Sequence, residues 1–290
     1  MEWLEGLERL FKDAVRDVCE ERTGVIFSSG VDSALVAYTA SEYSDVTAYT
    51  VGLEGSKDLE YARRVEEKAP FRIEYVELSV ECVESLIPEI LRVWSRPNPL
   101  DVGVGIPFYA ASRAASEDGL KLMLCGQGGD ELFGGYWRYL ESMVSEGKEA
   151  VIAWMDRDCE SADSDNLDRD RSMCRANGVE LRMPFLNEDF SGYVRKMALD
   201  LKIREDAEDM VCDEIDGRKF ARKYALKKLG LKTGVPDYIV NRLKKAAQYG
   251  SGTQKTLDKI ARRNGYKQKA AGEGRKDYLQ MYLEDVFKSI

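Results

Sequence analysis

The stretch GVIFSSGVDS, residues 24–33, joins a short apolar run to a turn of serine and glycine and then to an acidic residue. An amphipathic segment with helical spacing follows it. A strand that leads into a small-residue loop at a helix N-terminus directs backbone N–H groups and the positive end of the helix dipole to one point. The loop residues small enough to let a phosphate approach closely are Ser28, Ser29, Gly30 and Ser33. This segment predicts an anion-binding loop.

The spacing of this loop separates it from the most familiar nucleotide loop. It does not match GxxxxGK(S/T) and has no lysine at its end, which excludes a Walker-type site. It differs by one residue from SGGxDS, the pyrophosphate loop of enzymes that split ATP into AMP and pyrophosphate. Ser29 stands where that pattern has its first glycine.

A second glycine-rich motif, CGQGGDELFGGY at residues 125–136, also follows an apolar run. Asp130 and Glu131 lie between its paired glycines, at a predicted junction of strand and helix. Mg²⁺ takes one or two carboxylates together with phosphate oxygens and water, so a carboxylate beside a phosphate loop suits a magnesium-bound triphosphate. Taken alone, either motif also fits a glycine-rich turn with a solvated acidic cap.

Together and in this order, the two motifs resemble the ATP-pyrophosphatase domain of asparagine synthetases and the related β-lactam synthetases. That family's SGxGxDExFGGY is matched here from Gly126 to Tyr136. The resemblance is collinear over roughly residues 5–252 and includes three further stretches: RPNPLDVGVGIPFYAASR (96–113), GVELRMPFLN (178–187) and RLKKAAQYGSG (242–252).

The order of elements predicts an α/β fold with a parallel sheet flanked by helices, because strand-like and helix-like segments alternate. Strands are expected at 25–28, 46–53, 71–78 and 121–125, and helices at 32–42, 58–69 and 80–93. Both glycine-rich motifs then fall at the carboxyl ends of strands, where ligands of such sheets bind. Beyond about residue 154 the pattern turns helical, most clearly at 219–229 and 235–243.

The resemblance implies the adenine nucleotide alpha hydrolase-like version of this fold. We expect one asparagine-synthetase-type domain over residues 1–290. Residues 1–150 would form the α/β nucleotide-binding core, and residues 151–290 a mostly helical extension that completes the site.

Composition narrows the class of protein. The chain of 290 residues is 44% hydrophobic and 33% charged, as in globular proteins. No apolar run approaches the length of about 18 residues that spans a membrane, and the acidic, amphipathic N-terminus is not a secretory signal. The six cysteines form no CxxC pair, which argues against zinc, iron–sulfur and disulfide frameworks and fits a cytoplasmic protein. The absence of histidine excludes Ser-His-Asp hydrolysis and histidine metal sites.

Charge is distributed unevenly along the chain. Residues 1–214 carry 24 Lys and Arg against 45 Asp and Glu, whereas residues 215–276 carry 18 against 4. The basic segment could dock on the acidic body, form a solvated helical face, supply cations to ATP phosphates, or bind a polyanion such as nucleic acid.

The resemblance implies a set of nucleotide-binding residues. The phosphates would be held by Ser28, Ser29, Gly30, Asp32 and Ser33, with Gly126 and Gly128 of the second motif beside them. Mg²⁺ would be held by Asp32 and Asp130, although Asp32 also suits a helix cap. Adenine would be bound by the backbone after the second strand, at Val51, Gly52 and Leu53, which also read as plain strand residues.

Catalysis in the family is adenylation of a carboxylate followed by attack of an amine on the acyl-adenylate. Lys244 matches the family's late catalytic lysine, with Gly250 and Gly252 at the matching offsets and Arg242 as a weaker neighbour. The alternative is that Lys244 belongs to a solvated basic face.

Two further motif residues and one substitution concern the substrate side of the site. Glu180 and Arg182 would line the acceptor-substrate side, or else form a structural ion pair. Gln127, also among the expected catalytic residues, replaces the glutamate of asparagine synthetases. Because glutamine is neither a base nor a charge, handling of the attacking amine must differ here.

The matched motifs begin at residue 24, and Met1 is not followed by the nucleophilic cysteine of the full-length enzymes. We therefore expect a stand-alone form without the glutaminase domain. Its partners would be a small-molecule carboxylate, an amine donor and a second copy of the chain, with a separate glutaminase as one source of ammonia.

Three functions remain open. The first is an ATP- and Mg²⁺-dependent amide ligase that acts on aspartate or a related carboxylate. The second, favoured by the basic segment at 215–276, is an enzyme that adenylates a tRNA base. The third is an ATP-binding homologue without turnover.

Overall fold

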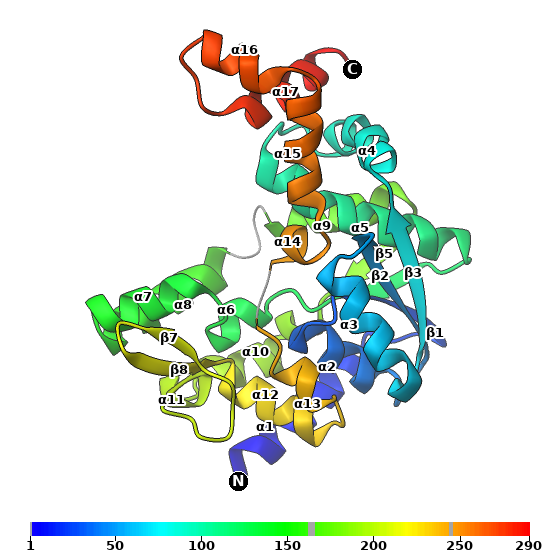
Figure 1. Ribbon diagram of the computed structural model, residues 1–290. Coiled ribbons are helices and arrows are strands. Elements are labelled where there is room, and N and C mark those ends of the chain that lie inside the picture. The colour runs from blue at the N-terminus through cyan, green and yellow to red at the C-terminus, as the bar shows by residue number, and fades with distance from the viewer. Residues whose placement is uncertain (1, 162–165, 244–245) are drawn as a thin grey trace.

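A five-stranded parallel sheet forms the centre of the molecule in the computed structural model, which describes residues 2–161, 166–243 and 246–290 (Figure 1). The strand order is β3-β2-β1-β4-β5. The strands are β1 (Arg22–Ile26), β2 (Asp45–Leu53), β3 (Arg72–Leu78), β4 (Leu122–Leu124) and β5 (Glu180–Arg182). The expected α/β class is confirmed. The sheet takes its fifth strand from beyond residue 150, so it draws on both sides of the expected internal boundary.

The strand β1 pairs in parallel with β2 on one side and with β4 on the other. Strands β2 and β3 are therefore added on one side of β1, and β4 and β5 on the opposite side. Val25 of β1 lies opposite Leu124 of β4. The two glycine-rich motifs begin just after these neighbouring strands and therefore meet at one edge of the sheet. A crevice at such a point, where the strand order reverses, is where open α/β sheets bind ligands.

Alternation along the strands places apolar side chains on both faces of the sheet. One face of strands β1, β2 and β4 contributes Val25, Ala48 and Leu124 to a core on one side of the sheet. The opposite face contributes Tyr49 and Met123 to a second core on the other side. This two-sided burial explains why these strands read as continuous apolar runs.

The helices that cover the sheet occupy most of the remaining chain. Those before residue 120 are α1 (Glu2–Arg16), α2 (Val31–Ala40), α3 (Lys57–Val65), the 3₁₀ turn Glu66–Lys68, α4 (Val80–Val93) and α5 (Pro99–Glu117). Those that follow are α6 (Gly129–Phe133), α7 (Trp137–Ser145), α8 (Lys148–Ser161), α9 (Asn166–Ala176), the 3₁₀ turn Pro184–Leu186, α10 (Glu188–Arg195), α11 (Leu199–Lys202), α12 (Tyr224–Lys232), α13 (Asp237–Val240) and α14 (Ala247–Gly250). No helix of the described chain is long and apolar enough to cross a membrane.

A small antiparallel sheet, of order β6-β8-β7, lies beside α7 and α12 (Figure 1). Its strands are β6 (Ile203–Glu205), β7 (Asp213–Ile215) and β8 (Arg218–Arg222). The helix predicted at 219–229 is therefore wrong in its first part, where β8 pairs with strands on both sides and buries Phe220 in a third core. The helix predicted at 235–243 shortens to the single turn α13.

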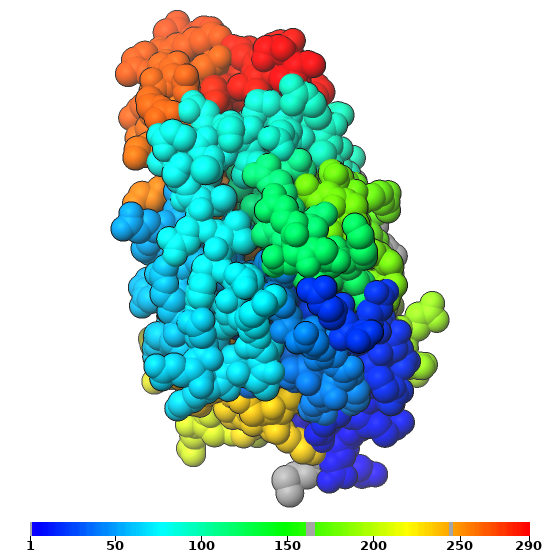
Figure 2. Space-filling model, turned by 90° about the vertical axis from the view of Figure 1, so that its right-hand side faces the viewer, coloured from blue at the N-terminus to red at the C-terminus, as the bar shows by residue number. Residues whose placement is uncertain are grey.

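Three C-terminal helices lie at one end of the molecule: α15 (Thr253–Arg263), α16 (Tyr266–Gly272) and α17 (Tyr278–Lys288). Helices α15 and α17 pack against α4, and α16 packs against α15 and α17. Figure 2 shows α16 and α17, in orange and red, capping that end above the cyan segment that contains α4. Leu257 and Ile260 of α15 are fully buried in the second core, so this unit is joined to the body by apolar packing.

Candidate functional site

A cavity of about 420 Å³ opens at the edge of the sheet where β1 and β4 end. Three segments supply the groups discussed below: the loop after β1, the second glycine-rich motif, and β8 with the start of α12. Helices α5 and α9, β7 and residues 242–243 and 246–248 line other parts of the cavity. The polar and charged residues that line it include Ser28, Asp32, Ser33, Gln127, Asp130, Glu131, Asp213, Arg222, Lys223, Lys227 and Arg242. This volume falls in the range of small-ligand pockets.

Glycine at 126 lets the two motifs meet. A Cβ atom at Gly126 would lie 2.8 Å from both Cβ of Asp32 and the backbone nitrogen of Ser33. Gly128 has φ +92°, a left-handed conformation that suits glycine, and it precedes the first turn of α6. The glycines of the second motif therefore permit a close approach to the start of α2 and a sharp turn into α6.

The loop after β1 presents hydroxyl groups at the N-terminus of α2. Ser28, Gly30 and Ser33 line the cavity, and the hydroxyls of Ser28 and Ser33 lie 3.2 Å apart. Ser29 has φ +56°, and its buried hydroxyl donates to the carbonyl of Asp58 at 3.2 Å rather than lining the cavity. The left-handed backbone at Ser29 gives a physical reason for the glycine that the family pattern has there.

An acid–lysine–acid cluster, formed by Asp32, Lys223 and Asp130, joins these three segments. Nζ of Lys223 lies 2.7 and 2.6 Å from the two carboxylate oxygens of Asp32 and 2.7 Å from Oδ1 of Asp130. Lys223 is 4% exposed. Burial acts to lower the pKa of Lys223, but the two carboxylates outweigh burial and raise that pKa above its ordinary value.

Sequence reasoning missed Lys223. It precedes α12 with φ +57°, and its N–H donates to the carbonyl of Phe133 at 3.2 Å, which turns the side chain toward the loops. In the sequence it is one basic residue in a predicted helix, and such residues are usually exposed. No local pattern signals the left-handed backbone that directs it inward.

The same cluster bears on the expected magnesium site. The carboxylates of Asp32 and Asp130 converge on one point, which the ammonium of Lys223 occupies. Among the residues that the structure describes, no group of three or more acidic or cysteine side chains could hold a metal ion unaided. Two carboxylates suit a cation that arrives with phosphate oxygens and water, which is the usual coordination of Mg²⁺. The residues present therefore fit Mg²⁺ bound together with a nucleotide.

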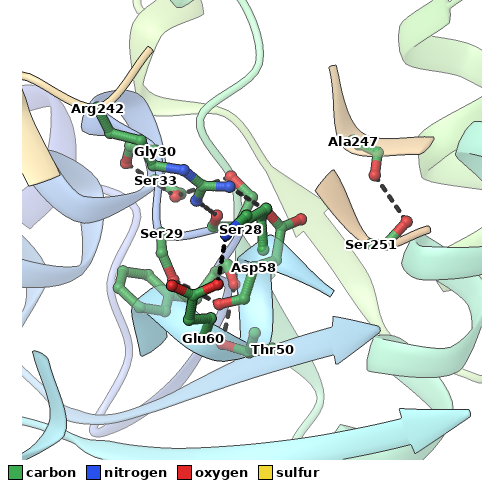
Figure 3. Close-up of polar contacts among 12 residues, drawn as sticks. Ser28, Ser29, Gly30, Ser33, Thr50, Asp58, Glu60, Arg242, Ala247 and Ser251 are labelled. Atoms are coloured by element: carbon green, nitrogen blue, oxygen red, sulfur yellow. Dashed lines mark hydrogen bonds and ion pairs between the residues drawn. The ribbon is translucent and has the colours of Figure 1, made fainter. Parts of the chain in front are cut away.

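Arg242, which follows α13, connects this segment to the phosphate loop through hydrogen bonds (Figure 3). Its guanidinium donates to the carbonyl of Ser28 and to Oδ1 of Asp58, both at 2.6 Å, and lies 4.4 Å from the ring centre of Tyr61. The side chains of Arg242 and Asp58 are 7% and 6% exposed. A Cβ atom at Gly250 would overlap the Asp58 carboxylate, so the glycine permits this approach. Arg242, expected only as a weak neighbour of Lys244, thus has a defined place.

Lys244 lies outside the described residues, and its catalytic role stays a prediction. The adenine assignment also stays a prediction, because Val51, Gly52 and Leu53 do not line the cavity. The N–H of Leu53, at the end of β2, donates to the carbonyl of Ser251 at 3.0 Å.

Glu180 and Arg182 lie on β5, outside the cavity. Nε of Arg182 is 2.8 Å from Glu180, and the guanidinium also donates to the carbonyl of Val18 at 3.1 Å. Hydrogen bonding to Arg182 lowers the pKa of Glu180. This geometry matches the structural ion pair that the sequence left open rather than a place beside a substrate.

Gln127 lines the cavity, and a hydrogen bond to a buried carboxylate fixes the orientation of its amide. Its Nε2 donates to the fully buried carboxylate of Asp170 at 2.5 Å, and Asp170 also accepts from Nε of Arg169 at 2.8 Å. Arg169 in turn contacts Asp101 at 3.0 Å. The carbonyl oxygen of Gln127 and its second amide N–H therefore remain for a ligand.

Many positive charges of the basic segment, residues 215–276, form ion pairs with acidic side chains of the same chain. Its lysine and arginine side chains contact acidic side chains in many places: Arg218 with Glu205, Arg222 with Asp213, Lys228 with Asp209, Lys232 with Glu8, Arg242 with Asp58, Arg262 with Asp258, Arg263 with Glu84, Lys269 with Asp285 and Arg275 with Asp277. These contacts favour docking on acidic partners over a free polyanion surface.

The comparison with protein families agrees with this geometry. The profile described as Asparagine synthase matches residues 6–158 and 144–283. The chain belongs to the asparagine synthase family. The cavity with its acid–lysine–acid cluster is therefore the candidate active site of a member of that family.

Individual relatives show the extent of the similarity. A Methanocaldococcus jannaschii protein described as a "putative asparagine synthetase (glutamine-hydrolyzing) 1" is 36% identical over 289 residues, which cover 93% of this chain and 53% of the relative. An asparagine synthetase (glutamine-hydrolyzing) of Sandersonia aurantiaca is 28% identical over 203 residues, 64% of this chain and 37% of the relative. This chain spans about half the length of the first of these relatives and less of the second.

Among solved structures, a U34-tRNA thiolase of Methanococcus maripaludis is similar with a TM-score of 0.37 and 13% identity, over 99% of this chain and 80% of that one. The NMN synthetase of Francisella tularensis has a TM-score of 0.34 and 13% identity, over 68% of this chain and 96% of that one.

Proposed function

We propose that this chain is an ATP-dependent amide-forming ligase. It would adenylate a carboxylate, aspartate or a related acid, and transfer the acyl group to ammonia or another amine, with release of AMP and pyrophosphate. The observation that carries the proposal is the acid–lysine–acid cluster, which lies beside a phosphate-type loop in a chain of the asparagine synthase family.

Binding of the triphosphate falls to the loop after β1. The N-terminus of α2 and the hydroxyls of Ser28 and Ser33 offer donors to phosphate oxygens in one place. Arg242 holds the carbonyl of Ser28 at 2.6 Å and so fixes the shape of this loop. A fixed loop lowers the cost of orienting the phosphates for reaction.

Charge develops on the α-phosphate and on the departing pyrophosphate during adenylation, so cations held near these groups stabilise the transition state. The position of Lys223 between Asp32 and Asp130 supports this role for it, and Lys244 is the second cation that we assign to this role. Mg²⁺ held by Asp32 and Asp130 would supply further neutralisation of phosphate charge. Lys223 would then exchange its carboxylate partners for phosphate oxygens.

Attack by the amine requires a group that orients its N–H bonds. The carbonyl oxygen of Gln127 can accept a hydrogen bond from the amine, because Asp170 binds the amide nitrogen. Gln127 cannot take up a proton. The amine must therefore reach the acyl-adenylate unprotonated, as ammonia rather than ammonium, or lose its proton to another group.

Product identity tests the proposal. Purified protein would be incubated with Mg·ATP, an ammonium salt and a panel of small carboxylic acids, and the nucleotide products separated by chromatography. We expect AMP and pyrophosphate in equal amounts, dependent on one of the acids. Stoichiometric ADP and phosphate would contradict the proposal. Bound ATP without turnover for any acid would support the non-catalytic alternative, and measurable tRNA binding with a steep salt dependence would support the tRNA-modifying one.

A further inference from the structure

Lys227 of α12 lines the same cavity one helical turn beyond Lys223, the residue that precedes this helix. The N–H of Lys227 donates to the carbonyl of Lys223 at 2.8 Å and so closes the first turn of α12. Lys227 is only 9% exposed. A lysine side chain is seldom buried to this extent unless a partner compensates its charge.

The partners of the basic residues in this wall differ sharply. Arg222 makes two hydrogen bonds to the carboxylate of Asp213, at 2.7 and 3.0 Å, and Lys223 contacts two carboxylates. Nζ of Lys227 donates to the carbonyl of Val211 at 3.2 Å. Within the described part of the chain, Lys227 has no ion pair. Of the three cations, Lys227 alone faces the cavity with a neutral acceptor.

A buried ammonium with a single neutral acceptor is costly, because much of its hydration is lost and little replaces it. Burial accordingly lowers the pKa of Lys227, and the carboxylate of Asp213, which acts to raise that pKa, is already hydrogen-bonded to Arg222. The next residue shows the ordinary arrangement: Lys228 points to the outside and pairs with Asp209. Selection for stability alone would favour an apolar or paired residue at 227, so a ligand is the natural source of the missing negative charge.

We propose that Lys227 is the docking cation for a second anionic group of the acid that this chain activates. The proposal rests on the proposed function and makes its substrate class more specific: a small acid with two anionic groups, of which one is adenylated and the other binds Lys227. The phosphates already have the α2 N-terminus and Lys223. Lys227 lies a further helical turn away, about 5.4 Å along the axis of α12.

Binding of succinate and butyrate tests this assignment, because the two acids have the same number of carbons but differ in one carboxylate. Titration calorimetry would be carried out on the full chain without nucleotide, for the wild type, Lys227→Met and Lys227→Arg. Lys228→Met serves as the matched control, since it removes a neighbouring cation that faces outward. Circular dichroism would verify that each variant is folded.

We expect the wild type and Lys228→Met to bind succinate at least tenfold more tightly than butyrate. Lys227→Met should lose about 10- to 100-fold in succinate affinity and keep its butyrate affinity, since a hydrogen bond between charged groups contributes about that much. Lys227→Arg, which keeps the charge, should retain most of the preference.

Two results would overturn the assignment. One is an equal affinity of the wild type for both acids. The other is a loss of pyrophosphate affinity in Lys227→Met with an unchanged preference for succinate, which would assign Lys227 to the phosphates. If the preference depends on Lys227 but no acid yields AMP, the subsite stands and the proposed function fails.

Discussion

Two walls face each other across the cavity and differ in how the chain builds them. The wall of the two glycine-rich loops supplies backbone donors, hydroxyls and the carboxylates of Asp32 and Asp130, all from short motifs at strand ends. The wall of β8 and α12 supplies the cations Arg222, Lys223 and Lys227. The first wall follows from local sequence, whereas the second exists only because a distant segment docks on the first. The proposed adenylation needs groups from both walls.

The largest effect should come from the acidic residues of the loop wall. Asp32→Asn or Asp130→Asn removes a proposed metal ligand and a partner of Lys223, so kcat/KM for ATP should fall by about 10³-fold. Steady-state pyrophosphate release would measure this, with thermal melting as the test of folding. Asp209→Asn, which alters an exposed ion pair with Lys228, should leave kinetics unchanged. Wild-type kinetics in both active-site variants would end the metal assignment.

A comparable effect is expected at Lys244, the cation that the sequence motif predicts for the site. Lys244→Met should reduce turnover about 10²- to 10³-fold with little change in ATP affinity, because the positioned charge acts mainly in the transition state. Lys245, which lies outside the matched pattern, should tolerate the same substitution. Equal, small effects at both positions would show that this run is a solvated basic face and that the motif alignment is wrong.

Lys223→Met tests the contact between the two walls directly, because Lys223 of one wall binds Asp32 and Asp130 of the other. The substitution removes the ammonium that lies between the carboxylates of Asp32 and Asp130, so the free energy of unfolding should fall by about 3–5 kcal/mol in metal-free buffer. Excess Mg²⁺ or Mn²⁺ should restore part of this loss in the variant and change the wild type less. Urea unfolding with and without metal measures both.

The control for this variant is Lys232, the last residue of the helix that Lys223 precedes. Lys232→Met removes an exposed pair with Glu8 and should cost less than about 1 kcal/mol. A similar loss for both variants, or no response of Lys223→Met to metal, would show that the cluster is not a cation site.

The smallest effect concerns the pH dependence of stability at two adjacent lysines. Burial lowers the pKa of Lys227 in the folded state, so the wild type should gain stability relative to Lys227→Met as pH rises from that lowered pKa toward 10.5. Hydrogen bonding to Asp209 raises the pKa of Lys228, so its contribution should be lost only above pH 10.5. Urea unfolding at several pH values would measure both differences. If the two differences in unfolding free energy changed with pH in the same way, the environments of Lys227 and Lys228 would not differ as we infer.

Much of the fold follows from the sequence, because long apolar strands alternate with helices and each carries its own pattern. The small sheet does not, since β6 and β7 have three residues each and show no periodicity. Residues 218–222 form a strand only because two short partners lie beside them. Strand pairing of this kind depends on tertiary contacts that a local pattern does not contain.

The site divides in the same way. The phosphate loop, Asp32 and Asp130 could be predicted because small residues and carboxylates follow strands at fixed spacing. Lys223 could not, because its left-handed backbone decides where the side chain points. For Glu180 and Arg182 the motif left both a substrate-side role and an ion pair open, and the two residues pair with each other away from the cavity. A sequence motif indicates where a loop lies, but it does not show to which face of the sheet a strand side chain points.

The central claim, that the two walls together activate a carboxylate as an acyl-adenylate, has a direct isotopic test. The acid that supports AMP formation would be labelled with ¹⁸O in both carboxylate oxygens, and the products of one turnover analysed by mass spectrometry. Adenylation joins a carboxylate oxygen to the α-phosphorus, and amine attack then breaks the acyl C–O bond. We therefore predict one ¹⁸O in AMP, one in the amide product and none in pyrophosphate. Unlabelled AMP, or ¹⁸O in inorganic phosphate, would contradict the account.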